Sequence, residues 1–168
     1  MKDTIVLRYI LPEEAEQAAD IEQICFPPNE ACPYDAMVQR ARAIPEQFLV
    51  AADQSNGLIA GFLNGIVTDE QAFRDEFFTD ISLNDPAGKN VMLVGLDVRP
   101  QYRRQGIAGA IMKRYAAIET ARGRRRLVLT CLEHLVPMYE HMGFRDLGIS
   151  GSVWGGCVWH EMEYRLGS

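Results

Sequence analysis

Residues 96–115 read LDVRPQYRRQGIAGAIMKRY, and they pass from an apolar strand through a basic turn into a helix of good helix formers. The first backbone N–H groups of a helix have no partner inside it, and the helix dipole adds partial positive charge there. Gly106 would let an anion approach the backbone, Ala108 is nearly as small, and Arg103 and Arg104 add charge. The turn is therefore predicted to cradle a small anion, phosphate above all.

Two better-known phosphate motifs are absent from this turn. No Gly-Lys-Ser/Thr sequence closes it, and the GxGxxG fingerprint of dinucleotide-binding folds is missing. An ordinary solvated basic loop remains open as the alternative.

The flanking sequence alternates between apolar runs and amphipathic segments. Helices are predicted at residues 11–26, 34–44, 106–121 and 136–144, and strands at 4–10, 47–53, 58–67, 91–98, 126–132, 144–149 and 156–166. The polar stretch 68–90 is predicted to form a helical turn or two and then a loop. This order predicts an α/β (α+β) fold in one domain, residues 1–168, with a mixed, largely antiparallel sheet of six to seven strands flanked by about four helices.

Composition narrows the classes of partner. The chain has 168 residues and a net charge of −6, which argues against nucleic acid as the main partner. No apolar run is long enough for a membrane span, and the start does not resemble a secretory signal. Four scattered cysteines and three histidines make no convincing metal set. We therefore expect a cytoplasmic protein with reduced thiols, no metal and no membrane partner.

Two segments carry a family resemblance. VRPQYRRQGIAGAIMKRY resembles the acetyl-coenzyme A motif of the GCN5-related N-acetyltransferases (GNAT), Arg/Gln-x-x-Gly-x-Gly/Ala, at Arg103, Gly106 and Ala108. LTCLEHLVPMYEHMGF resembles the later family pattern that ends in Tyr-x-x-x-Gly-Phe. Within the family the nearest likeness is to the arylalkylamine branch, the serotonin N-acetyltransferases. It also rests on ILPEEA, Cys32–Pro33, TDEQAF and WHEMEYRL, and it covers nearly the whole chain.

The resemblance implies a GNAT fold with two splayed central strands and acetyl-CoA as the cofactor. The pantetheine arm would pair with the backbone of Leu96, Asp97 and Val98. The pyrophosphate would be held by Arg103, Arg104, Gln105, Gly106, Ala108 and Gly109. Gly95 would permit a bulge in the strand, or serve as a packing glycine.

The resemblance also implies an N-acetyltransferase in which the primary amine of a small molecule, with arylalkylamines as candidates, attacks the thioester directly. Tyr139 would be the general acid that protonates the leaving thiolate. The acceptor pocket would involve Phe26, Pro33, Thr130, Trp154 and Trp159. Tyr139 and the two tryptophans also have a plainer interpretation as core residues.

The general base is where the sequence departs from the family. The arylalkylamine branch has two histidines on the strand before the motif, and Met92 and Val94 stand at those positions. A chain of waters, an amine that arrives neutral, or another residue would have to replace them. Glu133, His134 and His160 are candidates by position, although a surface role is favoured for each.

Other functions remain open on the sequence. The loss of both histidines favours a catalytically weak acyl-CoA-binding or sensor domain, and the acidic charge would suit acetylation of a basic protein or peptide amine. A nucleotide-binding regulator is disfavoured because no phosphate-loop lysine is present. The arginines of segment 122–126 follow the motif helix, whose negative dipole end favours cations. One of them is a candidate contact for the adenosine 3′-phosphate. The sequence is compatible with a monomer or a homodimer.

Overall fold

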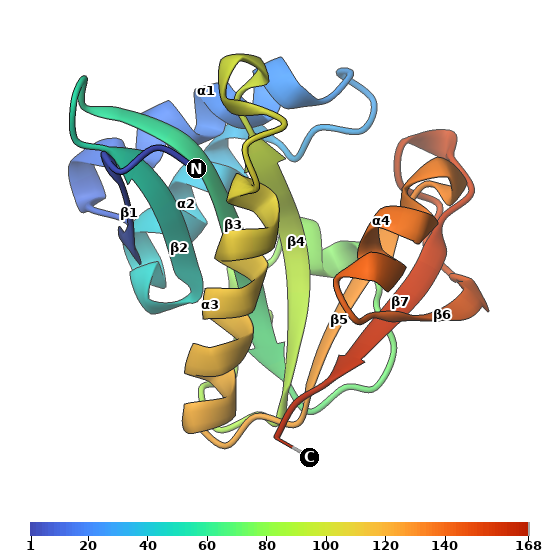
Figure 1. Cartoon of the computed structure of the whole chain (residues 1–168). Coiled ribbons are helices and arrows are strands. Elements are labelled where there is room, and N and C mark those ends of the chain that lie inside the picture. Colours follow the sequence, from blue (N-terminus) through green and yellow to red (C-terminus); the bar gives the residue numbers. More distant parts are fainter. Residues whose placement is uncertain (168) are drawn as a thin grey trace. The chain divides into compact units, whose positions relative to one another are not determined.

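The computed structural model describes residues 1–167, in which seven strands and four α-helices alternate with short 3-10 turns (Figure 1). The helices are α1 Ala15–Cys25, α2 Tyr34–Ala43, α3 Ile107–Ala121 and α4 Val136–His141. The strands are β1 Ile5–Tyr9, β2 Phe48–Asp53, β3 Leu58–Thr68, β4 Asn90–Val98, β5 Arg126–Cys131, β6 Arg145–Ile149 and β7 His160–Arg165. All the predicted elements are present, and the polar stretch 68–90 holds two 3-10 turns, as expected.

The strands are hydrogen-bonded in the order β1-β2-β3-β4-β5-β7-β6. β2 is antiparallel to β1 and β3, β7 is antiparallel to β5 and β6, and β4 is parallel to β5. The predicted mixed, largely antiparallel sheet of six to seven strands is therefore confirmed. The described residues divide into two compact units, Met1–Asn64 with Gly95–Tyr115, and Gly65–Val94 with residues 116–167. Strands β3 and β4 run through both.

The first unit packs α1 and α2 through small apolar side chains. Ala15, Ala18, Ala19 and Ile21 of α1 are fully buried, which is the face that their helical spacing predicts. A glycine permits close approach of two strands here. A Cβ at Gly61 would lie 2.4 Å from the carbonyl oxygen of Asp97, so only glycine fits at this point of β3.

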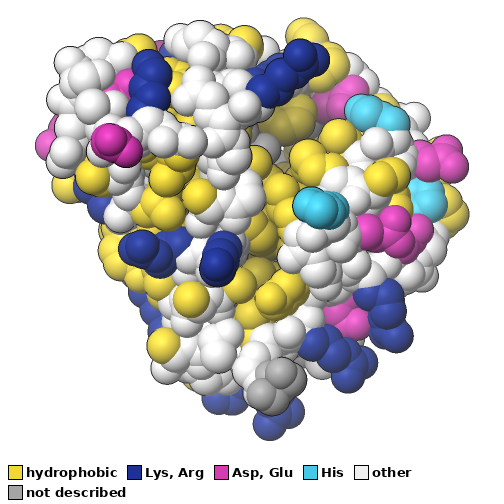
Figure 2. Space-filling view, in the orientation of Figure 1, with side chains coloured by type: hydrophobic (Ala, Val, Ile, Leu, Met, Phe, Trp, Pro, Cys, Tyr) yellow, Lys and Arg dark blue, Asp and Glu magenta, His cyan; other side chains and the backbone are white. Residues whose placement is uncertain are grey.

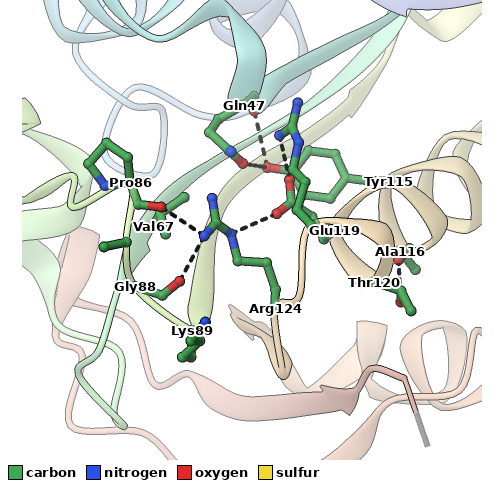
Figure 3. Close-up of polar contacts among 12 residues, drawn as sticks. Gln47, Val67, Pro86, Gly88, Lys89, Tyr115, Ala116, Glu119, Thr120 and Arg124 are labelled. Atoms are coloured by element: carbon green, nitrogen blue, oxygen red, sulfur yellow. Dashed lines mark hydrogen bonds and ion pairs between the residues drawn. The ribbon is translucent and has the colours of Figure 1, made fainter.

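The second unit uses the arginine-rich segment 122–126 structurally. Arg124 donates to the carbonyl oxygens of Pro86 and Gly88, both at 2.8 Å, and to the carboxylate of Glu119 at 3.1 Å (Figure 3). Glu119, which is almost fully buried, also pairs with Arg122 at 2.8 Å. These contacts stabilise the end of α3 and the loop before β4. They account for two of the arginines without any nucleic-acid partner.

The parallel pairing of β4 with β5 is short. It joins Asn90–Met92 to Arg126–Val128. Within the second unit, β4 continues through Leu93 and Val94 and β5 continues to Cys131, both beyond the last paired residues. This early end of the ladder agrees with the splayed central strands expected from the family resemblance.

The last strand begins later than predicted. The sequence suggested a strand over residues 156–166, but β7 starts at His160, and Trp154–Gly156 form a 3-10 turn. Gly155 and Gly156 adopt left-handed φ values of +62° and +72°, which a strand cannot contain, so the chain is still turning at residue 156. Trp154 and Trp159 therefore lie in the β6–β7 connection and not in a strand. In residues 1–167, no helix is long and apolar enough to cross a bilayer.

Candidate active site

The turn between β4 and α3 has the conformation of an anion cradle. Arg104 and Gly106 are both left-handed, with φ values of +61° and +79°, and Arg104 is the only non-glycine residue with positive φ in the described chain. Successive backbone N–H groups in a turn that contains left-handed residues can form a concavity that binds anions. A side chain is held in this costly conformation only where the surrounding structure fixes it.

The space in front of this turn is open. A Cβ placed on Gly106 or on Gly109 would meet no atom within 4 Å. The N–H of Ala110 donates to the carbonyl of Gly106 and is the first donor of the helical ladder, so the N–H groups of residues 107–109 have no acceptor within α3. Ile107 is buried and anchors the start of the helix, while Gly106 and Gly109 are exposed. An incoming phosphate would therefore meet backbone donors directly.

The arginines of the turn differ in their contacts. Arg103 is exposed, and its Nε donates to the carbonyl oxygen of Val98 at 3.0 Å, which ties the turn to the end of β4. The thiol of Cys25 donates to the same oxygen at 3.4 Å. Arg104 is also exposed, and Gln105 and Ala108 are partly buried. Of the predicted pyrophosphate residues, Arg103–Gly106 thus lie in the turn, and Ala108 and Gly109 lie in the first turn of α3.

Asp97, predicted only as a backbone contact, has a buried acidic side chain. It is 1% exposed and lies with Glu22 of α1, which is 3% exposed. Burial raises the pKa of Asp97 well above its usual value, and the charge of Glu22 and a hydrogen bond with it raise that pKa further. Burial also raises the pKa of Glu22, against the opposing effects of that hydrogen bond, the N–H of Cys32 and the charge of Arg40.

No motif in the sequence indicated this carboxyl pair. One available signal was that Glu22 follows Ala15, Ala18 and Ala19 on the buried face of α1, where an unpaired carboxylate is costly. A second was the lone acid, Asp97, near the end of an apolar strand.

In the second unit, Tyr139 lies on α4 and is 8% exposed. Its ring meets the ring of Phe144 edge-on, with centroids 5.7 Å apart, and the N–H of Phe144 donates to the carbonyl oxygen of Tyr139. Pro137 lies in the first turn of this short helix, where its missing N–H is tolerated. The position and orientation of Tyr139 are therefore fixed by packing.

Two predicted pocket residues, both tryptophans, lie in the β6–β7 connection of the second unit. Trp154 stacks on Phe78 with ring centroids 4.6 Å apart, and the indole N–H of Trp159 donates to the carbonyl of Trp154 at 2.9 Å. Asp75 ties this connection down by accepting from Ser152 and from the N–H of Val153. The two tryptophans are thus brought together with Phe78, a partner that sequence reasoning missed.

The other predicted pocket residues lie elsewhere. Thr130 is partly buried on β5, opposite Glu161 of β7. Phe26 and Pro33 mark the two ends of the irregular segment between α1 and α2, with Phe26 partly buried and Pro33 exposed.

The base candidates named from the sequence have unremarkable surroundings. Glu133 and His134 are exposed, and histidine side chains are visible at the surface in Figure 2. His160 is held by Asp146 through its Nδ1 at 3.1 Å. Met92 and Val94, at the positions of the family histidines, are buried apolar residues.

Cys131 lies opposite His160 in the β5–β7 ladder, and with Asp146 it superficially resembles a nucleophilic triad. However, burial, with a contribution from the charge of Asp146, raises the pKa of the Cys131 thiol to about 12. A thiol is a nucleophile only as its thiolate, so this cysteine is inert near neutral pH.

We therefore expect iodoacetamide at pH 8 to alkylate the partly exposed Cys157 of the native protein, and to leave the buried Cys131 and Cys32 unmodified. Peptide mass spectrometry gives the modified positions, and the same reaction in urea, where all four thiols should react, is the control. Alkylation of native Cys131 as fast as Cys157 would restore the nucleophile interpretation.

A separate open groove of about 790 Å³ lies in the second unit and contains none of the predicted catalytic, pyrophosphate or acceptor-pocket residues, although Arg125 and Arg126 belong to the segment expected to offer a contact for the adenosine 3′-phosphate. It is lined by Lys89, Arg125, Arg126 and Arg165 together with Asp69 and Glu163. Arg126 is already paired with Glu163 and bound to the backbone of Gln71. Much of its charge is therefore neutralised within the protein.

A sequence model of the Acetyltransferase (GNAT) family matches residues 15–144. The serotonin N-acetyltransferase of Mesocricetus auratus is 28% identical over 163 residues, which are 95% of this chain and 76% of that protein.

Solved structures share the fold at low identity. The loading GNATL domain of CurA from Lyngbya majuscula aligns with a TM-score of 0.81 at 12% identity, over 96% of this chain and 97% of that one. A phosphinothricin acetyltransferase from Sinorhizobium meliloti, solved in complex with acetyl-CoA, aligns with a TM-score of 0.70 at 18% identity, over 98% and 89%.

Proposed function

Since the chain belongs to the GNAT acetyltransferase family, we propose that it transfers an acetyl group from acetyl-CoA to the primary amine of a small molecule, with arylalkylamines as the first candidates. Membership confirms the family and the enzyme class, an N-acetyltransferase, that the sequence indicated. The coenzyme A donor agrees with the acetyl-CoA complex solved for the Sinorhizobium relative. The acceptor amine and the residue roles are the proposal.

The observation that carries this proposal is the open turn from Arg104 to Gly109. It offers backbone donors, left-handed geometry and an unobstructed approach, which are the requirements of a pyrophosphate. Arg104 would add a charged donor. The neighbouring residues Leu96 and Val98 are partly exposed on β4, as a strand that pairs with a pantetheine arm requires.

In the proposed reaction the neutral amine attacks the thioester carbonyl, so that the N–C bond forms and the C–S bond breaks. The electron pair of the broken bond goes to sulfur, and Tyr139 donates the proton that sulfur receives. Holding the two reactants together supplies much of the rate enhancement. The aromatic pair of Trp154 and Phe78 supports an acceptor with an apolar or aromatic body.

The test is the release of free thiol from acetyl-CoA in the presence of a panel of amines. The panel contains tryptamine, 2-phenylethylamine, polyamines, amino acids and short peptides. We expect turnover with one class of small amine, arylalkylamines first. Turnover confined to peptides would replace the small-molecule acceptor by a protein or peptide amine.

One observation favours a second candidate, an acyl-CoA-binding sensor. The two positions that hold histidines in the arylalkylamine branch are occupied here by Met92 and Val94, which are buried and apolar. Tight binding of coenzyme A by calorimetry without thiol release for any amine would support the sensor and overturn the proposed enzyme.

A further inference from the structure

Three polar atoms converge on the place where Gly95 has no side chain. A Cβ at this residue would lie 3.0 Å from Nδ2 of Asn64, 3.4 Å from Oδ1 of Asp97 and 3.5 Å from Oε1 of Glu22. Gly95 itself is partly exposed, whereas those three side chains are buried. The missing side chain therefore leaves a small polar position beside a buried carboxyl pair.

The carboxyl oxygens at this position lack donors. Oε1 of Glu22 and both carboxyl oxygens of Asp97 accept no hydrogen bond from an N–H or O–H group of the described residues. Leaving such acceptors buried and unpaired is energetically costly, and more so when the groups are charged. A proton on one of the two acids removes a charge and supplies a donor to the other, as in other buried carboxyl pairs.

The groups that face the pair permit one such proton. Arg40 of α2 is the nearby cation, and it is itself 2% exposed; its Nε donates to Oδ1 of Asn64 at 2.9 Å and its Nη2 to Sγ of Cys32 at 3.2 Å. The N–H of Cys32 donates to Oε2 of Glu22 at 2.9 Å. The titratable groups around the pair are Cys25 on α1, Cys32 before α2, Arg40 on α2 and, next to Cys25, Arg103. One cation beside two buried acids favours a pair with a single negative charge.

We infer that Glu22 and Asp97 act together as the proton acceptor for the amine. Glu22 is the carboxylate that takes the proton, and Asp97 is the protonated partner that donates a hydrogen bond to Glu22. This inference rests on the proposed function. It fills the gap left by Met92 and Val94 with residues that no motif indicated. It also specifies the acceptor as an amine that arrives as an ammonium ion.

The proton balance is simple. The ammonium donates one proton from nitrogen to the carboxylate of Glu22, which leaves the neutral amine free to attack. After the N–C bond forms, nitrogen loses a second proton, and sulfur gains one from Tyr139. One of the two protons that nitrogen loses restores the phenol of Tyr139, and the other leaves from Glu22. One proton per turnover therefore reaches solvent, and the position at Gly95 is the partly exposed point beside the pair.

The test compares the pH dependence of kcat/KM in four variants, measured by thiol release with acetyl-CoA. The acceptor is 2-phenylethylamine, or the panel amine turned over fastest if that is another. For Glu22→Gln we expect a loss of about 10²-fold at pH 7 with an unchanged KM for acetyl-CoA. The loss should shrink as the pH approaches the pKa of the amine, because the amine then arrives neutral.

Asp97 is tested by two substitutions. Asp97→Ala removes the donor that lowers the pKa of Glu22, so the acid limb of the profile should move to higher pH, with about tenfold less activity on that limb. Asp97→Asn keeps a donor and should reverse part of the shift. Glu16→Gln, on the exposed face of the same helix, is the matched control and should follow the wild type.

A loss of kcat/KM in Glu22→Gln that is equal at every pH would indicate a structural role and overturn the inference. A wild-type kcat/KM of Glu22→Gln at pH 7 would also overturn it.

A second readout does not depend on turnover. In wild-type protein labelled with ¹³C at its carboxyl groups, Asp97 should titrate well above the ordinary aspartate value of about 3.9, and at lower pH in Glu22→Gln. Titration of Asp97 in the ordinary range would also overturn the inference.

The two proposals fail differently. Absence of thiol release by the wild type with every amine overturns the proposed function, and the catalytic role of the pair with it, even if the carboxyl titration is as expected. Thiol release by the wild type together with an unaffected Glu22→Gln overturns only the pair.

Discussion

Replacing Tyr139 by phenylalanine is expected to lower kcat by about 10²- to 10³-fold, because the phenol is the proposed donor to the departing thiolate. The substitution removes one oxygen and keeps the ring, so the edge-on contact with Phe144 and the fold should be retained. Thiol release under saturating acetyl-CoA and amine measures the effect, and thermal unfolding checks the fold.

Tyr164→Phe is the matched control, since the ring of Tyr164 contacts the same Phe144 at a centroid distance of 5.4 Å. It should keep the wild-type kcat. Equal activity of Tyr139→Phe and the wild type would remove the acid role and leave Tyr139 as a core residue.

The second large effect is expected from Gly109→Glu, which should raise the KM for acetyl-CoA by about 10²-fold with a smaller change in kcat. The new carboxylate would stand where the phosphates are proposed to bind, and like charges placed together cost several kcal/mol. Folding should not suffer, because a Cβ at Gly109 meets no atom within 4 Å. An acid in the first helical turn is favourable, and replacing glycine in a helix contributes up to about 1 kcal/mol.

Gly109→Gln separates charge from size in this experiment. It has nearly the same shape without the charge and should raise the KM less than the glutamate does. Steady-state kinetics at varied acetyl-CoA measures both, and a wild-type KM in Gly109→Glu would show that the cofactor does not use this turn.

Local patterns were sufficient to predict most of the elements. The spacing of Ala15, Ala18 and Ala19 indicated the buried face of α1, and the basic glycine turn before α3 was expected to be open to an anion. Both depend on residues near one another in the chain. The late start of β7 was not predicted, because the left-handed conformations of Gly155 and Gly156 follow from how the connection is held.

The carboxyl pair could not be predicted for a different reason. Glu22 and Asp97 meet only because α1 packs on strands whose order and register are set by the whole first unit. The stacking of Trp154 on Phe78 likewise depends on Asp75 holding the β6–β7 connection. Periodicity predicts that a side chain is buried, but it does not identify the distant residue that it meets.

The β6–β7 connection has a spectroscopic consequence. The chain contains two tryptophans, and both lie in this one connection, where the indole of Trp159 is bonded to the backbone of Trp154. Selective excitation of indole would therefore report on this connection alone. An aromatic amine that bound against Trp154 would change the emission. The protein thus carries an intrinsic fluorophore confined to the proposed acceptor pocket.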